Sequence, residues 1–107
     1  MPTAADMAIT FVSCPPEHAE RLAQSLVDAR LAACVNVLPK MRSVYRWRDA
    51  VEHADEALLL IKHPAARFDA LRAAVLDAHP YELPEIVAVR IDDAHSPYLD
   101  WINASCS

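Results

Sequence analysis

Glycine is absent from all 107 residues of the chain. Glycine is the residue that adopts a positive φ with least steric cost, so any such position must be filled by asparagine, aspartate or another residue at some cost. Loops that cradle phosphate with closely spaced glycines, such as the GxGxxG and P-loop types, are therefore excluded.

Positive charge and long apolar runs are also scarce. The ten lysine and arginine residues are scattered along a chain of formal net charge −5, which argues against a nucleic-acid partner. The longest apolar run, 57–61, is too short to span a membrane, and the N-terminal MPTAADMAITF lacks the basic start and apolar stretch of a signal peptide. We therefore expect a soluble, cytoplasmic protein without a membrane partner.

The chain has few cysteines, and their number and spacing do not suggest disulfide pairs. Cys14, Cys34 and Cys106 are an odd number, and no CxxC spacing occurs. Both facts argue against a disulfide framework and a structural zinc site, so we expect reduced thiols. Cys14 could approach Cys34 if their strands are neighbours, whereas Cys106 lies in a tail expected to fray.

Length and composition favour one domain spanning residues 1–107, with its core from about 7 to 104. Apolar residues make up 54% of the chain and charged residues 23%, which is typical of a globular protein. A monomer of this size cannot easily bury so much apolar surface, so the composition also favours an oligomer.

Hydrophobic periodicity predicts four strands and three helices. The strands are expected at 7–14, at 32–38 continuing beyond Pro39 to 48, at 56–62 and at 85–91, and the helices at 16–30, 64–79 and 96–104. The second and third strands form a long hairpin, with a bulge at Pro39 and the polar connector RDAVEHAD (48–55) between them. Ser96 and Pro97 are expected as the N-cap and first residue of the last helix.

The order βαββαβ, followed by a short C-terminal helix, predicts an α+β ferredoxin-like sandwich. Right-handed crossovers place the two long helices on the same face of the sheet. The other face is then bare, yet apolar side chains alternate so as to line both faces: Leu58, Leu60, Val87 and Val89 on one, and Leu59, Ile61, Ile86 and Ala88 on the other. We expect a second copy of the sheet to cover the bare face in a closed homo-oligomer.

Five segments together resemble the CutA family of divalent-cation tolerance proteins: LAACVNV (31–37), SVYRW (43–47), EALLLIK (56–62), HPYELPEI (79–86) and YLDW (98–101). The resemblance implies a PII-like homotrimer whose sheets face the three-fold axis, with a role in tolerance of copper and other divalent cations. Lys40 and Ala50 depart from it, because family members usually carry glycine at these two turns.

The resemblance and the residue types together suggest a metal site at Cys34, His79 and Glu82, for copper or another divalent cation. Other interpretations of Cys34 and of the 79–86 segment stay open. Cysteine in an apolar strand is more commonly a small buried hydrophobic residue. Pro80 and Pro84 exclude a helical ligand pair, so the 79–86 segment is either a stiff connector or a rigid loop that presents its polar side chains at a cleft between subunits.

Four further residues are expected to line that cleft: Tyr45, Trp47, Lys62 and Tyr81. Packing is the commoner role for Tyr45 and Trp47 and solvation for Lys62, whereas packing and a cleft-lining role are about equally expected for Tyr81.

The expected function is a trimeric metal-binding or signalling module in metal-ion homeostasis. The alternative is a PII-like allosteric trimer that binds a small organic or anionic effector and has no direct metal role. No serine or cysteine nucleophile is visibly tied to a histidine and a third group, so we do not expect an enzyme. The sequence names no specific metal, and it leaves open a protein partner of unknown identity.

Overall fold

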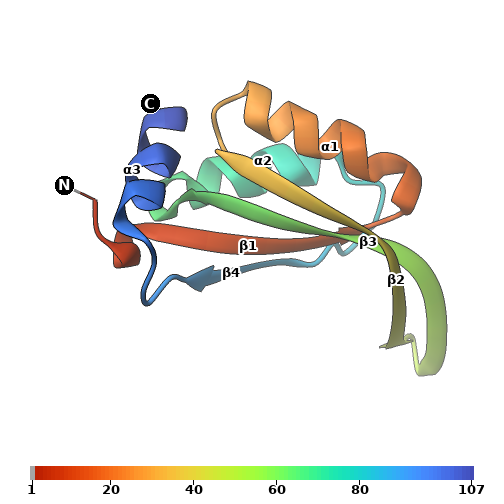
Figure 1. Ribbon diagram of the computed structural model, residues 1–107. Helices are drawn as coiled ribbons and strands as arrows, with labels where there is room; N and C mark the ends of the chain where they lie inside the picture. The colour runs from red at the N-terminus through yellow and green to blue at the C-terminus, as the bar shows by residue number, and fades with distance from the viewer. Residues whose placement is uncertain (1) are drawn as a thin grey trace.

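The computed structural model describes residues 2–107 and has the predicted order of elements (Figure 1). The strands are β1 (Met7–Cys14), β2 (Cys34–Trp47), β3 (Ala50–Pro64) and β4 (Ile86–Arg90), and the helices are α1 (Pro16–Asp28), α2 (Phe68–Ala78) and α3 (Ser96–Ser105), with short 3-10 turns η1 (Ala4–Asp6) and η2 (Ala65–Arg67). The sheet has the order β2-β3-β1-β4, and every neighbouring pair is antiparallel. This is the predicted ferredoxin-like sandwich, with α1 and α2 on one face (Figure 1).

The β2–β3 hairpin is longer than the sequence predicted. The polar connector expected at 48–55 is mostly strand, because β3 begins at Ala50 and only two residues turn the chain. Cross-strand pairing therefore continues through a solvent-exposed stretch that lacks the apolar alternation on which the prediction depended. Figure 1 shows this part of the hairpin curving away from the helices.

Two helix starts also differ from the prediction. Pro64 ends β3 instead of opening a helix, and the 3-10 turn η2 precedes α2. Ser96 lies inside α3, and His95 occupies the N-cap position without a side-chain capping bond. Pro97 still lies in the first turn, where its missing N–H leaves no intrahelical bond unmade.

Three residues of the described chain carry the positive φ that glycine would favour: Arg30 (60°), Arg48 (50°) and Asp49 (67°). Arg30 ends α1 in a Schellman motif, in which Leu31 N–H donates to Leu26 O at 3.0 Å. Arg48 and Asp49 form the two-residue hairpin turn, where two successive positive φ angles match the strand twist. Lys40 and Ala50 are not among them, and Lys40 instead lies in the predicted bulge between Leu38 and Met41.

The core lies between the sheet and helices α1 and α2. Leu59 and Ile61 of the central strand β3 are fully buried there. The helices contribute side chains at the predicted spacing, among them Leu22, Leu26, Leu71 and Val75. A smaller cluster packs α3 against the start of β1 and buries Cys106, so the expectation of a frayed tail was wrong.

The opposite face of the sheet is open, as predicted. Strand register places seven apolar side chains there: Ile9, Phe11, Leu38, Leu58, Leu60, Val87 and Val89. We call this set the open sheet face. Val87 is 50% exposed and Val89 49%, although both are β-branched residues suited to a packed sheet.

No helix within residues 2–107 combines the length and apolar character needed to cross a bilayer.

A histidine without solvent exposure lies within the core side of the sheet. The Thr10 hydroxyl donates to His63 Nε2 at 2.6 Å, and His63 Nδ1 donates to Pro64 O at 2.7 Å. A carbonyl can only accept, so Nδ1 carries a proton, and in the neutral ring Nε2 is then the nitrogen that accepts from Thr10. Burial lowers the pKa of His63, although the bond to Pro64 acts in the opposite direction.

We expect this histidine to make the fold less stable in acid. Below pH about 6.5 the unfolded chain binds a proton that folded His63 resists, so the free energy of unfolding falls as the pH drops. One such site contributes a slope of at most about 1.4 kcal/mol per pH unit. Urea unfolding from pH 7.5 to 5 should show a shallower decline in His63→Gln, and equal declines in both proteins would refute this assignment.

Candidate functional site

His79 is one of the residues that hold the 79–85 loop, between α2 and β4, against the sheet. This side chain is 8% exposed. Its Nε2 donates to Ser13 O at 2.7 Å, and its Nδ1 accepts from Tyr81 N–H at 3.1 Å. The imidazole therefore has both nitrogens occupied, and it joins the end of α2 to the end of β1.

Two carboxylates hold the same loop through neutral donors. Tyr81 donates its hydroxyl hydrogen to Glu56 Oε2 at 2.8 Å, and the Ser13 hydroxyl donates to Glu85 Oε1 at 3.1 Å. Burial raises the pKa of Tyr81, and the hydrogen bond to Glu56 raises it further. Tyr81 consequently remains a protonated donor, and the nearly buried Glu56 has a partner for its charge.

A third contact joins the 79–85 loop to the tip of the β2–β3 hairpin. Arg48 donates to Glu82 Oε2 at 3.1 Å, and both side chains are more than 70% exposed. The Arg48 guanidinium also lies 5.3 Å from the centre of the Trp47 ring. Tyr45 is close enough to contribute to the raised pKa of Tyr81, which is due chiefly to burial. The predicted residues Tyr45, Trp47, Tyr81 and Glu82 thus gather at one end of the molecule.

Cys34 and Lys62 lie at the other end, where they face each other across β2 and β3. Cys34 Sγ lies 3.9 Å from Asn36 Oδ1, and Lys62 Nζ donates to the same oxygen. Tyr98 of α3 borders the group: burial raises its pKa, and the neighbouring Cys34 thiol adds to the effect. The structure therefore separates the predicted site residues into two groups.

The distance between these groups follows from strand register. Cys34 pairs with Lys62, whereas Tyr81 contacts Glu56, six residues earlier on β3. Six strand residues span roughly 20 Å. Cys14 is also remote from Cys34, because β3 separates their strands and Cys14 pairs with Ala57 in the core. The two thiols were expected to approach each other only if their strands are neighbours, and this condition is not met.

The residues of one protomer do not fit a metal ion. Across the described part of the chain, no group of three or more histidine, cysteine, aspartate or glutamate side chains converges. The His79 nitrogens are occupied, and the Lys62 ammonium close to Cys34 would repel a cation.

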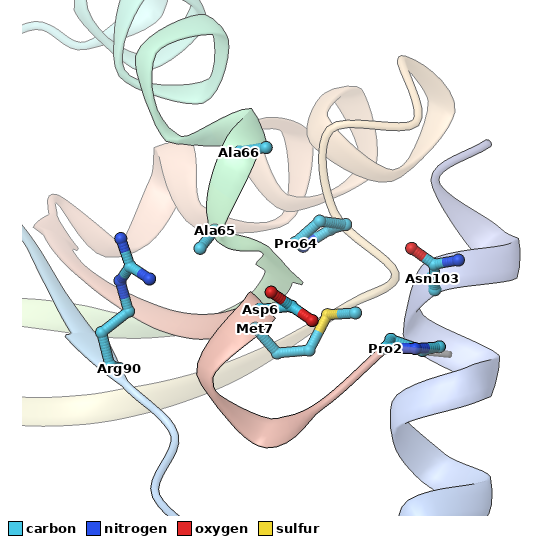
Figure 2. Close-up of a pocket in the computed structure, with 8 residues that line it drawn as sticks. All are labelled: Pro2, Asp6, Met7, Pro64, Ala65, Ala66, Arg90 and Asn103. Carbon is cyan, nitrogen blue, oxygen red and sulfur yellow. The ribbon is translucent and has the colours of Figure 1, made fainter.

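An open pocket of about 570 Å³ lies near the N-terminus, at the α3 end of the sheet (Figure 2). Figure 2 shows Asp6 between Arg90 of β4 and Asn103 of α3. The Asp6 carboxylate accepts from Thr3 N–H at 2.9 Å, which lowers its pKa, and Arg90 donates to Ala5 O at 2.9 Å. The bond from Arg90 joins the N-terminal segment to β4, and none of the predicted site residues lines the pocket.

Sequence reasoning missed several contacting residues: Ser13, Asn36, Arg48, Glu56, Glu85 and Tyr98. The role of Glu56 could have been predicted from the sequence, because it is a carboxylate at the start of an apolar strand. A carboxylate buried there needs a hydrogen-bond donor. Asn36, Glu85 and Tyr98 lie within the segments that carry the family resemblance, but nothing in the sequence indicated which partners they contact.

Comparisons with known proteins agree with this fold. The family model described as CutA1 divalent ion tolerance protein matches residues 8–105. The divalent-cation tolerance protein CutA of Thermus thermophilus is 42% identical over 95 residues, which cover 88% of this chain and 92% of the relative. The crystal structure of CutA from Xylella fastidiosa has a TM-score of 0.92 and 40% identity, and covers 95% of this chain and 99% of its own.

A PII-like protein CutA from Nostoc, in apo form, has a TM-score of 0.89 at 32% identity, with 94% of this chain and 97% of that chain covered. The chain spans about half the length of the mammalian relatives it matches, 55% of the mouse protein and 54% of the human one. Relatives from rice and Archaeoglobus fulgidus are named as chloroplastic and periplasmic, respectively. With the family model matched over residues 8–105, this chain belongs to the CutA1 divalent ion tolerance protein family.

Proposed function

We propose that the protein works in divalent-cation tolerance as a cytoplasmic homotrimer that binds a ligand or relays a signal and does not catalyse a reaction. The open sheet face carries this proposal. Its seven apolar side chains occupy one side of a four-stranded sheet whose other side is fully packed. Contiguous apolar surface of this kind marks an interaction site, and a closed symmetric assembly would bury it on every protomer.

The assembly would create the ligand cleft. Within one chain the Cys34 group and the 79–85 loop lie at opposite ends of the sheet. In our proposal the Cys34 end of one protomer meets the hairpin tip and 79–85 loop of its neighbour, so that Tyr45, Trp47 and Tyr81 line the cleft beside Lys62. Cys34 and Glu82 are the proposed copper ligands, because a thiolate and an exposed carboxylate can exchange their partners.

His79 has a different part in this proposal from the one its residue type suggests. A metal could bind it only after it released Ser13 or Tyr81. The proposal therefore makes His79 a positioning residue that holds the 79–85 loop in place, and Glu82 with it.

Calorimetric titration with Cu(I) and Cu(II) tests the metal role. We expect Cys34→Ala to weaken Cu(I) binding by at least about tenfold, since it removes the thiolate that favours this ion. Cys106→Ala is the matched control, because that thiol is buried in the cluster that packs α3 against β1, and its loss should leave binding unchanged. Unchanged affinity in Cys34→Ala, Glu82→Gln and His79→Ala would remove these residues from a metal role.

One observation favours the alternative, an organic or anionic effector. The Lys62 ammonium and the Asn36 amide flank Cys34, and this pairing attracts an anion better than a cation. A thermal-shift screen of anionic metabolites, run with chelator present, tests this function. A true effector raises the melting temperature with concentration, and Lys62→Met should abolish the shift.

A further inference from the structure

The pocket of Figure 2 lies where three strands of the sheet end. β1 begins at Met7, which pairs with Pro64 at the end of β3, and β4 ends at Arg90, which pairs with Ala8. The turns η1 and η2 adjoin the sheet at this place, and α3 stands beside its end (Figure 1). Together these elements leave an open volume of about 570 Å³. Pockets that bind small molecules have volumes in this range.

Two opposite charges line this pocket without pairing. Asp6 ends η1 and Arg90 ends β4, and both side chains border the pocket (Figure 2). Neither residue belongs to an ion pair among residues 2–107. Hydrogen bonds from the backbone and the side chain of Thr3 lower the pKa of Asp6, so its carboxylate is charged at neutral pH. Unpaired charges of both signs on one pocket favour a ligand that also carries both signs.

Both charged groups keep bonding capacity for such a ligand. Asp6 accepts from the N–H and the hydroxyl of Thr3 through one oxygen, Oδ2, at 2.9 and 3.1 Å. Arg90 donates to Ala5 O through Nη1 alone. The second carboxylate oxygen and the other guanidinium nitrogens form no hydrogen bond in the described part of the chain. The existing bonds therefore hold the two side chains in place and leave donors and an acceptor for a ligand.

We propose that this pocket binds a small zwitterion, an α-amino acid with an apolar side chain. The ammonium group of the ligand donates to Asp6, and its carboxylate accepts from Arg90. Its side chain lies against the half-buried Pro64 and Ala65. The amide of Asn103, on the α3 side of the pocket, can bond to either charged end of the ligand. Arg90 would repel an amine and Asp6 an acid, so the pocket favours a molecule that carries both groups.

This inference goes beyond the proposed function and uses none of its residues. Arg90 pairs with Ala8, which is buried on the core side of the sheet, whereas the neighbouring Val89 belongs to the open sheet face. Side chains alternate along a strand, so Arg90 projects from the side that carries the helices. A trimer formed through the open sheet face does not need to cover this wall of the pocket.

The test titrates L-leucine into the native, metal-free protein and follows the backbone amide signals by NMR. Two analogues each lack one charge: 3-methylbutylamine has no carboxylate, and 4-methylpentanoate has no ammonium group. We expect leucine to shift the amide signals of Asp6, Arg90 and Asn103 to saturation. Each analogue should bind about tenfold or more weakly, because it loses a hydrogen bond between charged groups.

Two variants assign the charges to their roles. Asp6→Asn keeps an acceptor for Thr3 but removes the negative charge, so leucine should bind about tenfold or more weakly while 4-methylpentanoate binds no worse. Arg90→Met should weaken leucine equally and leave 3-methylbutylamine no worse. The matched controls are Asp77→Asn and Arg72→Met, which remove the same charges from the exposed surface of α2 and should leave leucine binding unchanged.

Three results would overturn the proposal. They are no saturable binding of leucine below about 10 mM, shifts confined to residues away from the pocket, and equal affinities for leucine and both analogues. Each leaves the molar mass of the assembly and its copper affinity unaffected, so this proposal and the proposed function fail separately.

Discussion

Leu60→Glu should convert the proposed trimer into monomers of 11.9 kDa. Leu60 lies on β3 in the middle of the open sheet face, opposite Asn36 on one side and Phe11 on the other. In the proposed trimer a glutamate at this position would carry an unpaired charge into an apolar contact, at a cost of several kcal/mol per protomer. The measurement is molar mass by light scattering after size-exclusion chromatography, and circular dichroism checks that the monomer keeps its fold.

Leu76→Glu is the matched control for this variant. Leu76 lies on the exposed surface of α2, on the side of the molecule away from the open sheet face, and is 52% exposed. The substitution adds the same charge and removes the same side chain, so it should leave the mass unchanged. If both variants dissociate, or neither does, the open sheet face is not the interface.

His79→Ala should destabilise the folded chain by about 2–4 kcal/mol, although the residue lies in a loop. The substitution leaves Ser13 O and Tyr81 N–H without their partner, and it removes a ring contact at 4.8 Å between His79 and Tyr81. Unfolding in urea measures the effect. His79→Gln serves if the alanine variant does not fold, because its amide can still donate a hydrogen bond and the loss should be smaller.

Glu82→Gln provides the comparison for this loop. It breaks only the exposed ion pair with Arg48, and exposed pairs contribute about 0–1 kcal/mol. We therefore expect a change below about 1 kcal/mol, with the 79–85 loop still held by His79, Tyr81 and Glu85. A loss in Glu82→Gln as large as that in His79→Ala would contradict the view that the buried bonds hold the loop.

The fold could be predicted closely because its apolar residues alternate with the periods of strand and helix. The strand at Met7–Cys14 has the bounds expected of it, and Leu59 and Ile61 face the core while Leu58 and Leu60 do not. The β3 side of the hairpin tip, residues 50–55, could not be predicted this way, since it is mostly polar and exposed. Backbone pairing alone makes it a strand, and pairing leaves no apolar pattern.

The candidate site was predictable only in part. The segment containing His79, Tyr81 and Glu82 could be recognised, but its bonds join residues far apart in the chain, such as His79 and Ser13, which are 66 positions apart. No local pattern encodes such a contact. The role of His79 illustrates the difficulty: residue type suggested a metal ligand, whereas burial and two hydrogen bonds make it a structural anchor of its loop in one protomer.

The sequence shows plainly that glycine is absent, but it did not show which positions need a positive φ. The cost was expected at Lys40 and Ala50, and the structure instead places positive φ at Arg30, Arg48 and Asp49. A bulge absorbs the irregularity at Lys40, and the hairpin turns at Arg48 and Asp49, directly before Ala50. A turn is located by the register of both strands, which the sequence of one strand does not give.

The solution mass of the unmodified protein is the most direct test of the proposed homotrimer. Light scattering at micromolar concentration, in buffer with chelator and reductant, should give three times the chain mass of 11.9 kDa, because the open sheet face needs a cover in the absence of any metal. A single species of 11.9 kDa would show that this face stays exposed in solution, and it would contradict both the trimer and the cleft proposed between its protomers.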